Sequence, residues 1–171
     1  QPAHQATRVD PSHAFSWAKL GQVLRHVRRY DEALEAYNRA IELEPESTWA
    51  INGKGIVMEQ LDRYEEALAC YVQAANLKPD DIWHWYNQGN VLVLMHQYQD
   101  ALAPLERATR INADHPRSWA RLGNALRHLN RLDEALEVGL RATELASNQP
   151  WAWNELGSTY EARGENNAAL K

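Results

Sequence analysis

Apolar side chains recur along this chain with the period of an α-helix rather than the two-residue period of a strand. The first stripe is formed by Trp17, Leu20, Gly21 and Leu24, at i, i+3, i+4 and i+7, so these residues share one helix face. A second stripe follows the short polar segment 26–32 and consists of Leu34, Tyr37, Ala40 and Ile41. The pattern predicts two antiparallel helices joined by a tight turn.

The same pattern returns every 34 residues. A glycine marks each first helix, at Gly21, Gly55, Gly89, Gly123 and Gly157. An alanine marks each second helix, at Ala33, Ala67, Ala101, Ala135 and Ala169. Since one helical hairpin cannot bury its apolar stripes alone, such units must stack on their neighbours. The sequence therefore predicts an all-α protein made of stacked antiparallel hairpins.

The register divides the chain into one partial and five further segments. Residues 1–13 are the expected end of a preceding repeat, because Ala6 and Pro11 match Ala40 and Pro45 in register. The repeats that follow are 14–47, 48–81, 82–115, 116–149 and a truncated 150–171. We interpret the chain as part of a longer protein. Apolar faces at its two ends, including that of Leu156 and Tyr160, are expected to favour end-to-end self-association.

These repeats resemble the tetratricopeptide repeat (TPR) family. The first unit carries nearly its whole pattern, in Trp17, Leu20, Gly21, Leu24, Ala33, Tyr37, Ala40 and Pro45. Other units depart from it: Lys54 and Gln88 stand where leucine is usual, and Gly139 replaces the aromatic residue of the second helix. The resemblance implies a right-handed superhelical solenoid with a concave groove that binds peptides.

Composition narrows the possible functions. The net charge of -5 and pI of about 5.8, with both signs interspersed, argue against nucleic acid and membrane surfaces as partners, since both attract a basic excess. One cysteine, Cys70, excludes an internal disulfide framework. The histidines lack metal-ligand spacing, and no motif of nucleophilic catalysis or phosphate binding is complete. We expect no enzyme activity, no cofactor and no metal, and a cytoplasmic location.

The tryptophans separate into two classes by position within the repeat. Residues two apart on a helix project about 200° apart, so Trp85 and Trp83 face opposite ways. Trp17, Trp85, Trp119 and Trp153 share the fourth position, which we assign to the core. Phe15, Trp49, Trp83, Arg117 and Trp151 share the second position, which lines the groove in the family that the chain resembles. The competing interpretation is that these second-position aromatics fasten each helix to the preceding unit.

Polar candidates share the groove face. Tyr86 lies on this face, and a set of carboxamides on or beside it is placed to bind a peptide main chain: Asn52, Asn87, Asn90, Asn124 and Asn154. The competing interpretation is that exposed asparagines are simply solvated. Some members of the resembling family clamp a terminal carboxylate. Of the five corresponding positions, Asn52, Ile56, Asn87, Arg117 and Arg121, only the last three keep a suitable residue.

Arg117 and Arg121, one turn apart, remain candidates for pairing with an isolated acidic side chain. Arg127 and His128 repeat the Arg25–His26 pair of the first unit. They are either a second cationic contact or the trace of a duplicated block.

We therefore expect a protein–protein interaction module that binds an extended peptide or protein segment in its groove. The alternative is a structural or regulatory arm of a larger protein whose groove is occupied by another part of the same chain.

Two expectations on stability follow from the register. Trp85→Ala should lower the free energy of unfolding by several kcal/mol, whereas Trp83→Ala should change it by no more than about 1 kcal/mol. Trp153 is expected to fill the space beside Gly139, so its replacement by alanine should cost about 3–5 kcal/mol. Thermal melts of the three variants measure these differences, and equal losses for Trp83 and Trp85 would contradict the assignment.

Overall fold

The computed structural model describes residues 12–164, and helices are the only regular elements within that range. The all-α expectation is confirmed. The chain divides between Pro79 and Asp80 into two compact units, which we call the first and second units. The N-terminal residues 1–11 lie outside the description, as do residues 165–171, which include Ala169.

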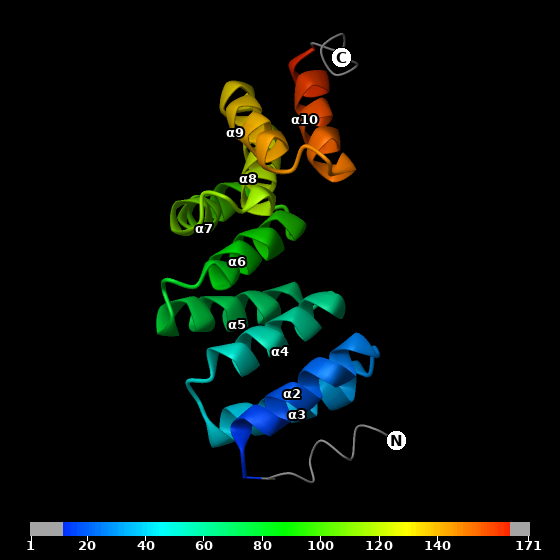
Figure 1. The fold of residues 1–171 in the computed structure, drawn as a ribbon, viewed down its shortest axis with the longest axis vertical. Helices are drawn as coiled ribbons and strands as arrows, with labels where there is room; N and C mark the ends of the chain where they lie inside the picture. The colour runs from blue at the N-terminus through cyan, green and yellow to red at the C-terminus, as the bar shows by residue number, and fades with distance from the viewer. Residues whose placement is uncertain (1–11, 165–171) are drawn as a thin grey trace. The chain divides into compact units, whose positions relative to one another are not determined.

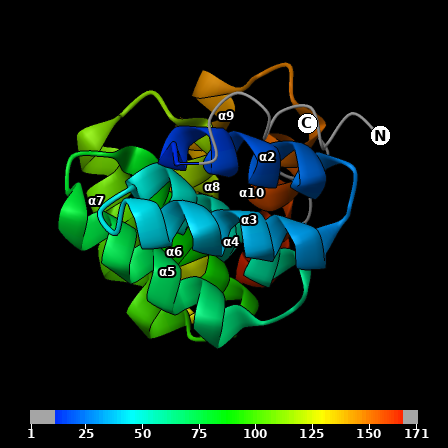
Figure 2. The same ribbon diagram turned by 90° about the horizontal axis from the view of Figure 1, so that it is seen from below.

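The first unit holds two hairpins. Its helices are α2 (Ala14–His26), α3 (Tyr30–Leu43), α4 (Thr48–Gln60) and α5 (Tyr64–Leu77). The helices of each hairpin lie side by side and run in opposite directions (Figures 1 and 2). Helix α4 also packs on α3, and its start contacts α2. The two hairpins therefore stack, as the repeat pattern predicts.

The second unit holds two complete hairpins and one further helix. Its helices are α6 (Ile82–Leu94), α7 (Tyr98–Ile111), α8 (Pro116–His128), α9 (Leu132–Leu145) and α10 (Pro150–Arg163). Helix α8 packs on α7 and contacts both α6 and α10, while α10 packs on α9. The first helices of successive hairpins are thus neighbours, and their shared face carries the groove candidates.

Each hairpin turns at one residue with left-handed backbone. The four residues are spaced by 34 and have φ near 60°: Arg28, Asp62, His96 and Asn130. The N–H of the following residue reaches back to a carbonyl in the last helical turn, as from Arg63 to Met58 at 2.9 Å. This bond satisfies a helix-terminal carbonyl, which helps offset the roughly 1–2 kcal/mol cost of left-handed backbone in a residue with a side chain.

The core depends on close contact between a large second-helix side chain and a first-helix glycine. Tyr37 and Tyr71 are fully buried. A Cβ added at Gly21 would lie 3.0 Å from the Tyr37 ring, and one added at Gly55 would lie 2.7 Å from the Tyr71 ring. The Tyr71 hydroxyl donates to Glu59 Oε2 at 2.9 Å. Burial and the neighbouring Glu59 carboxylate raise the pKa of Tyr71, which keeps the hydroxyl protonated as a donor.

The expectation for Trp153 is wrong. The side chain beside Gly139 is Leu156, whose Cδ1 would lie 3.2 Å from an added Cβ, and Trp153 is 53% exposed. Its indole Nε1–H donates to the carbonyl of Ser147 at 2.8 Å. Ser147 lies in the loop between α9 and α10, so this bond fastens the ring edge to the loop rather than to the core. Trp153→Ala should therefore cost less than a fully buried aromatic would.

The packing of Leu156 against Gly139 also corrects the expected apolar surface for end-to-end self-association. Leu156 is only 3% exposed, so it does not offer an apolar surface for self-association. The fourth-position residues Trp17, Trp85 and Trp119 are half-buried rather than buried. Trp83, by contrast, is 52% exposed. Trp85 is therefore more buried than Trp83, as expected, but because it is not fully buried, the stability lost in Trp85→Ala should exceed that in Trp83→Ala by less than first expected.

Glycine-to-alanine substitutions test the close contacts. A Cβ at Gly89 would lie 2.7 Å from Leu105 Cδ2, whereas one at Gly123 would lie 3.2 Å from Val138 Cγ2. Gly89→Ala should therefore destabilise the protein by about 1–3 kcal/mol through overpacking. Gly123→Ala is the matched control, because a gain of up to about 1 kcal/mol in helix propensity offsets its milder crowding. Chemical denaturation measures the free energy of unfolding of both variants. Equal losses of stability would show that the close contact between Gly89 and Leu105 does not limit the packing.

Candidate functional site

A small cavity opens on the shared face of the first helices in the second unit. It has a volume of about 120 Å³ and receives Tyr86 from α6, three residues from α8 and two from α10. The full lining is Tyr86, Arg117, Ala120, Arg121, Trp151 and Glu155. We call it the groove pocket. It joins four of the residues proposed from sequence, Tyr86, Arg117, Arg121 and Trp151, which come from three successive repeats.

Arg117 and Trp151 form one wall of the groove pocket. The guanidinium carbon of Arg117 lies 5.5 Å from the centroid of the Trp151 ring, within the range of a cation–π interaction. Arg117 is exposed and Trp151 is half-buried. The ring therefore supports the guanidinium from one side, and the guanidinium still has solvent-facing donors for a ligand.

Glu155 gives the groove pocket an anionic side. Its Oε2 accepts a hydrogen bond from Asn124 Nδ2 at 3.2 Å and lies 3.8 Å from Nη2 of Arg127. Arg127 is only 20% exposed. Its positive charge is thus compensated by Glu155 within the protein. Arg117 and Arg121 are the cationic residues that line the groove pocket.

An aromatic cluster borders the groove pocket at Tyr86. The rings of Trp83 and Tyr86 each lie edge-on to that of His115, with centroids 5.2 Å apart in both cases. His115 Nδ1 is hydrogen-bonded to Ser118 Oγ at 2.8 Å. Burial, followed by the nearby charge of Arg117, lowers the pKa of His115. Both effects disfavour protonation of the imidazole, and the neutral ring suits packing against Trp83 and Tyr86.

His128 lies in a different contact from the one expected. Its ring stacks on that of Tyr98, with centroids 4.2 Å apart and planes 3° from parallel, and Tyr98 Oη is hydrogen-bonded to His96 Nδ1 at 2.7 Å. Burial, then the charges of Arg127 and His96, lower the pKa of His128. Protonation is thus disfavoured, and the structure does not place His128 with the residues of the groove pocket.

The asparagine set is only partly on the surface. Asn90 is buried, at 8% exposure, and the amide nitrogen of Asn124 is engaged by Glu155. Asn52 and Asn87 are half-buried in their own units. Asn154 is exposed on α10. The five carboxamides therefore do not form one uniformly open row, and Asn87 is the one that follows Tyr86 directly in sequence.

The first unit carries its own aromatic contact at the second repeat position. The rings of Phe15 and Trp49 have centroids 5.1 Å apart, and Lys19 Nζ lies 5.2 Å from the Trp49 centroid. Trp49 also packs against the hydrophobic core of its unit. Trp49 thus contributes to packing as well as to the surface, unlike the more exposed Trp83.

Three residues with contacts at or near the candidate surfaces do not stand out in the sequence: Lys19, His115 and Glu155. Lys19 and Glu155 hold the same repeat position as Arg121. The 34-residue spacing of these three charged residues is thus the sequence signal that points to both. His115 lies in the loop before α8 and has no helical register. Only the packing of the loop shows its contacts.

No three His, Cys, Asp or Glu side chains of residues 12–164 gather where they could hold a metal ion. None of the described helices combines the length and the apolar character needed to cross a membrane.

Similarity to known sequences is repeat-based. Three tetratricopeptide repeat models match the chain, over residues 14–47, 60–96 and 86–150. The small glutamine-rich tetratricopeptide repeat-containing protein 2 of Mycosarcoma maydis is 38% identical over 45 residues. That match covers 26% of this chain and 13% of the relative, so the chain spans only a small part of that protein's length.

Solved structures of similar fold cover nearly the whole chain. YrrB, described as a TPR protein with an unusual peptide-binding site, has a TM-score of 0.80 at 26% identity over 99% of this chain and 88% of its own. MamA from Desulfovibrio magneticus RS-1 has a TM-score of 0.84 at 22% identity, over 92% and 89%. The Cut9–Hcn1 structure has a TM-score of 0.85 at 18% identity, over 98% and 33%.

The sequence models and the stacked hairpins agree. This chain contains tetratricopeptide repeats.

Proposed function

We propose that this chain is a protein-interaction module that binds an extended peptide or protein segment on the shared face of its first helices. Tetratricopeptide repeats are protein-interaction modules, and their fold is generally a non-catalytic scaffold. The observation that carries the proposal is the groove pocket, in which side chains from three successive repeats converge. An extended segment that crosses the repeats would contact all three helices.

The lining indicates what kind of side chain the groove pocket takes. Arg117 and Arg121 present guanidinium donors, and Tyr86 and Trp151 present ring surface. Arginine and large aromatic residues dominate the energetics of protein interfaces. Glu155 is occupied by Asn124 and Arg127, so its charge opposes an incoming anion less than a free carboxylate would. A segment with an acidic residue beside an apolar one fits this lining.

Similarity to YrrB supports the same kind of ligand. That protein is described as having a peptide-binding site. The identity of 26% does not carry over individual residues, so the proposal for this chain depends on its own pocket.

The second candidate is an arm of a larger protein whose groove is filled in cis. The groove pocket, of about 120 Å³, would take one side chain of an extended segment whether that segment is supplied in cis or by another protein. Under this alternative, a peptide that binds the 171-residue chain would bind the longer parent protein much more weakly.

The proposal predicts a charge-specific loss of binding. Peptides selected from a random display library on the 171-residue chain should be enriched in Asp or Glu beside an apolar residue. Arg121→Ala should weaken their binding about tenfold or more, because it removes a charge-assisted contact. Trp83→Ala should weaken peptides that extend over α6, while leaving the melting temperature nearly unchanged.

Arg110→Ala is the matched control. Arg110 is exposed on α7 and its Nε–H donates to the carbonyl of Glu106, so this variant loses the same charge outside the groove pocket. Its binding should stay within about twofold of wild type at physiological salt, where distant surface charges are screened. Fluorescence-anisotropy titrations measure the affinity of each variant for the peptide. If Arg110→Ala and Arg121→Ala lose the same affinity, the effect of charge is nonspecific and the proposed site is wrong.

A further inference from the structure

A second, larger pocket lies on the outward side of the fourth hairpin, between the start of α8 and α9. It has a volume of about 420 Å³. Its lining is Trp119, Glu137, Val138, Leu140, Arg141 and Glu144. We call it the outer pocket. It shares no residue with the groove pocket. Trp119 is two residues from both Arg117 and Arg121 on α8, so its side chain projects about 200° away from each of theirs.

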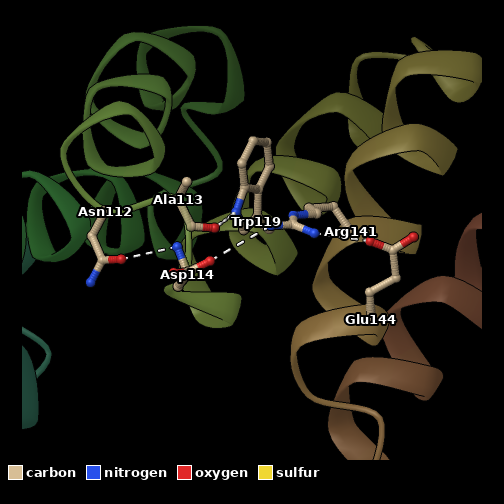
Figure 3. A network of polar contacts seen from close by, with 6 residues as sticks. All are labelled: Asn112, Ala113, Asp114, Trp119, Arg141 and Glu144. Carbon is tan, nitrogen blue, oxygen red and sulfur yellow. Dashed lines mark hydrogen bonds and ion pairs between the residues drawn. The ribbon is translucent and has the colours of Figure 1, made fainter.

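The wall formed by Trp119 is held in place by hydrogen bonding. The indole Nε1–H of Trp119 donates to the carbonyl of Ala113 in the loop between α7 and α8, at 2.8 Å (Figure 3). The polar edge of the ring is thus satisfied within the protein. Its remaining surface is apolar and can receive a ligand without leaving a buried donor unpaired.

Arg141 closes the opposite side through two ion pairs. Its Nη2 lies 3.6 Å from Asp114 Oδ1, and its Nη1 donates to Glu144 Oε2 at 3.1 Å (Figure 3). Asp114 is in turn oriented by its own N–H, which donates to Asn112 Oδ1 at 2.9 Å. These contacts join the loop before α8 to α9, so the pocket has a formed rim before any ligand binds.

Leu140 is the unusual residue of the outer pocket. It is 42% exposed on a helix face that points to solvent. The equivalent residues of the first and third hairpins are Asn38 and Glu106. The second hairpin has Val72, which is 36% exposed, but the buried Ile51 stands there in place of the tryptophan. The first hairpin also keeps the tryptophan and the acidic residues, as Trp17, Glu35 and Glu42. The fourth hairpin thus differs by placing an exposed leucine next to an accessible tryptophan, and such apolar surface typically marks an interaction site.

Charge around the outer pocket favours a cationic partner. Asp114 and Glu144 share the single guanidinium of Arg141, and Glu137 adds a third carboxylate on the rim. Three carboxylates against one guanidinium leave a net negative rim. Glu137 precedes Leu140 by three residues and Glu144 by seven, so all three lie along one helix face.

We propose that the outer pocket is a second protein-docking site, which binds a segment whose apolar side chain contacts Trp119 and Leu140 while an adjacent lysine or arginine pairs with Glu137. This site is independent of the groove, and its charge preference is the opposite of that of the groove pocket. One chain could therefore hold two different segments at once without competition.

The test uses the same random display library on the 171-residue chain, with counter-selection on Leu140→Asn. This substitution introduces the residue of the first hairpin, so it should leave folding intact, as a thermal melt verifies. Clones enriched on wild type over the variant should carry an apolar residue next to Lys or Arg. Their affinity should fall about tenfold or more in Leu140→Asn, and severalfold in Glu137→Gln.

The tryptophan indole signals in ¹H–¹⁵N spectra locate the binding. A selected basic peptide should shift the Trp119 signal and leave that of Trp151 unchanged, whereas groove ligands should do the reverse. Arg121→Ala should not affect the basic peptide, so failure of the groove proposal and failure of this one are distinguishable. Absence of enrichment over Leu140→Asn, enrichment of acidic clones, or a shift at Trp151 alone would overturn the proposal.

Discussion

Close packing of a large second-helix side chain against a first-helix glycine is the constraint on which the first three hairpins depend. In the fourth hairpin Gly139 takes the place of the large side chain, and Leu156 of α10 lies beside it. Tyr37, Tyr71 and Leu105 are fully buried in successive hairpins, and a Cβ on the facing glycine would crowd each of them. Fully burying such a side chain contributes about 1.5–3 kcal/mol, which the glycine makes possible by letting the helices approach. In these three hairpins the glycine face of the first helix is therefore turned toward the second helix. That orientation decides which side chains face the neighbouring first helices and are available to a ligand.

Helix α8 shows how the orientation of a first helix separates two surfaces. Arg117 and Arg121 line the groove pocket, while Trp119 between them faces the outer pocket. The first surface is lined by guanidinium groups and the second is rimmed by carboxylates. Electrostatic complementarity acts mainly on specificity and association rate. Opposite charges on the two sides would therefore keep two partner segments from exchanging sites.

The ion pairs of the molecule differ in what they can do. The pair between Arg63 and Glu66, three residues apart after a hairpin turn, is exposed, and such pairs contribute little to stability. The contacts of Glu155 with Asn124 and Arg127 are more enclosed, so water screens them less. Their effect is to fix the charge pattern of the groove pocket, because they remove Arg127 from the set of available cations and leave Arg117 and Arg121.

The sequence by itself determined the helical hairpins, their 34-residue spacing and the opposite orientation of Trp83 relative to Trp85, because helical periodicity is a local property of the chain. It also identified Arg117 and Trp151, which share the second repeat position, Tyr86 on the same helix face, and Arg121 through the family resemblance. Tertiary structure alone decided what each side chain contacts across repeats. The burial of Asn90 and Leu156, the exposure of Trp153 and the stacking of His128 on Tyr98 depend on neighbouring helices and loops. The outer pocket likewise needs residues from a loop and two helices, whose proximity no single-helix pattern specifies.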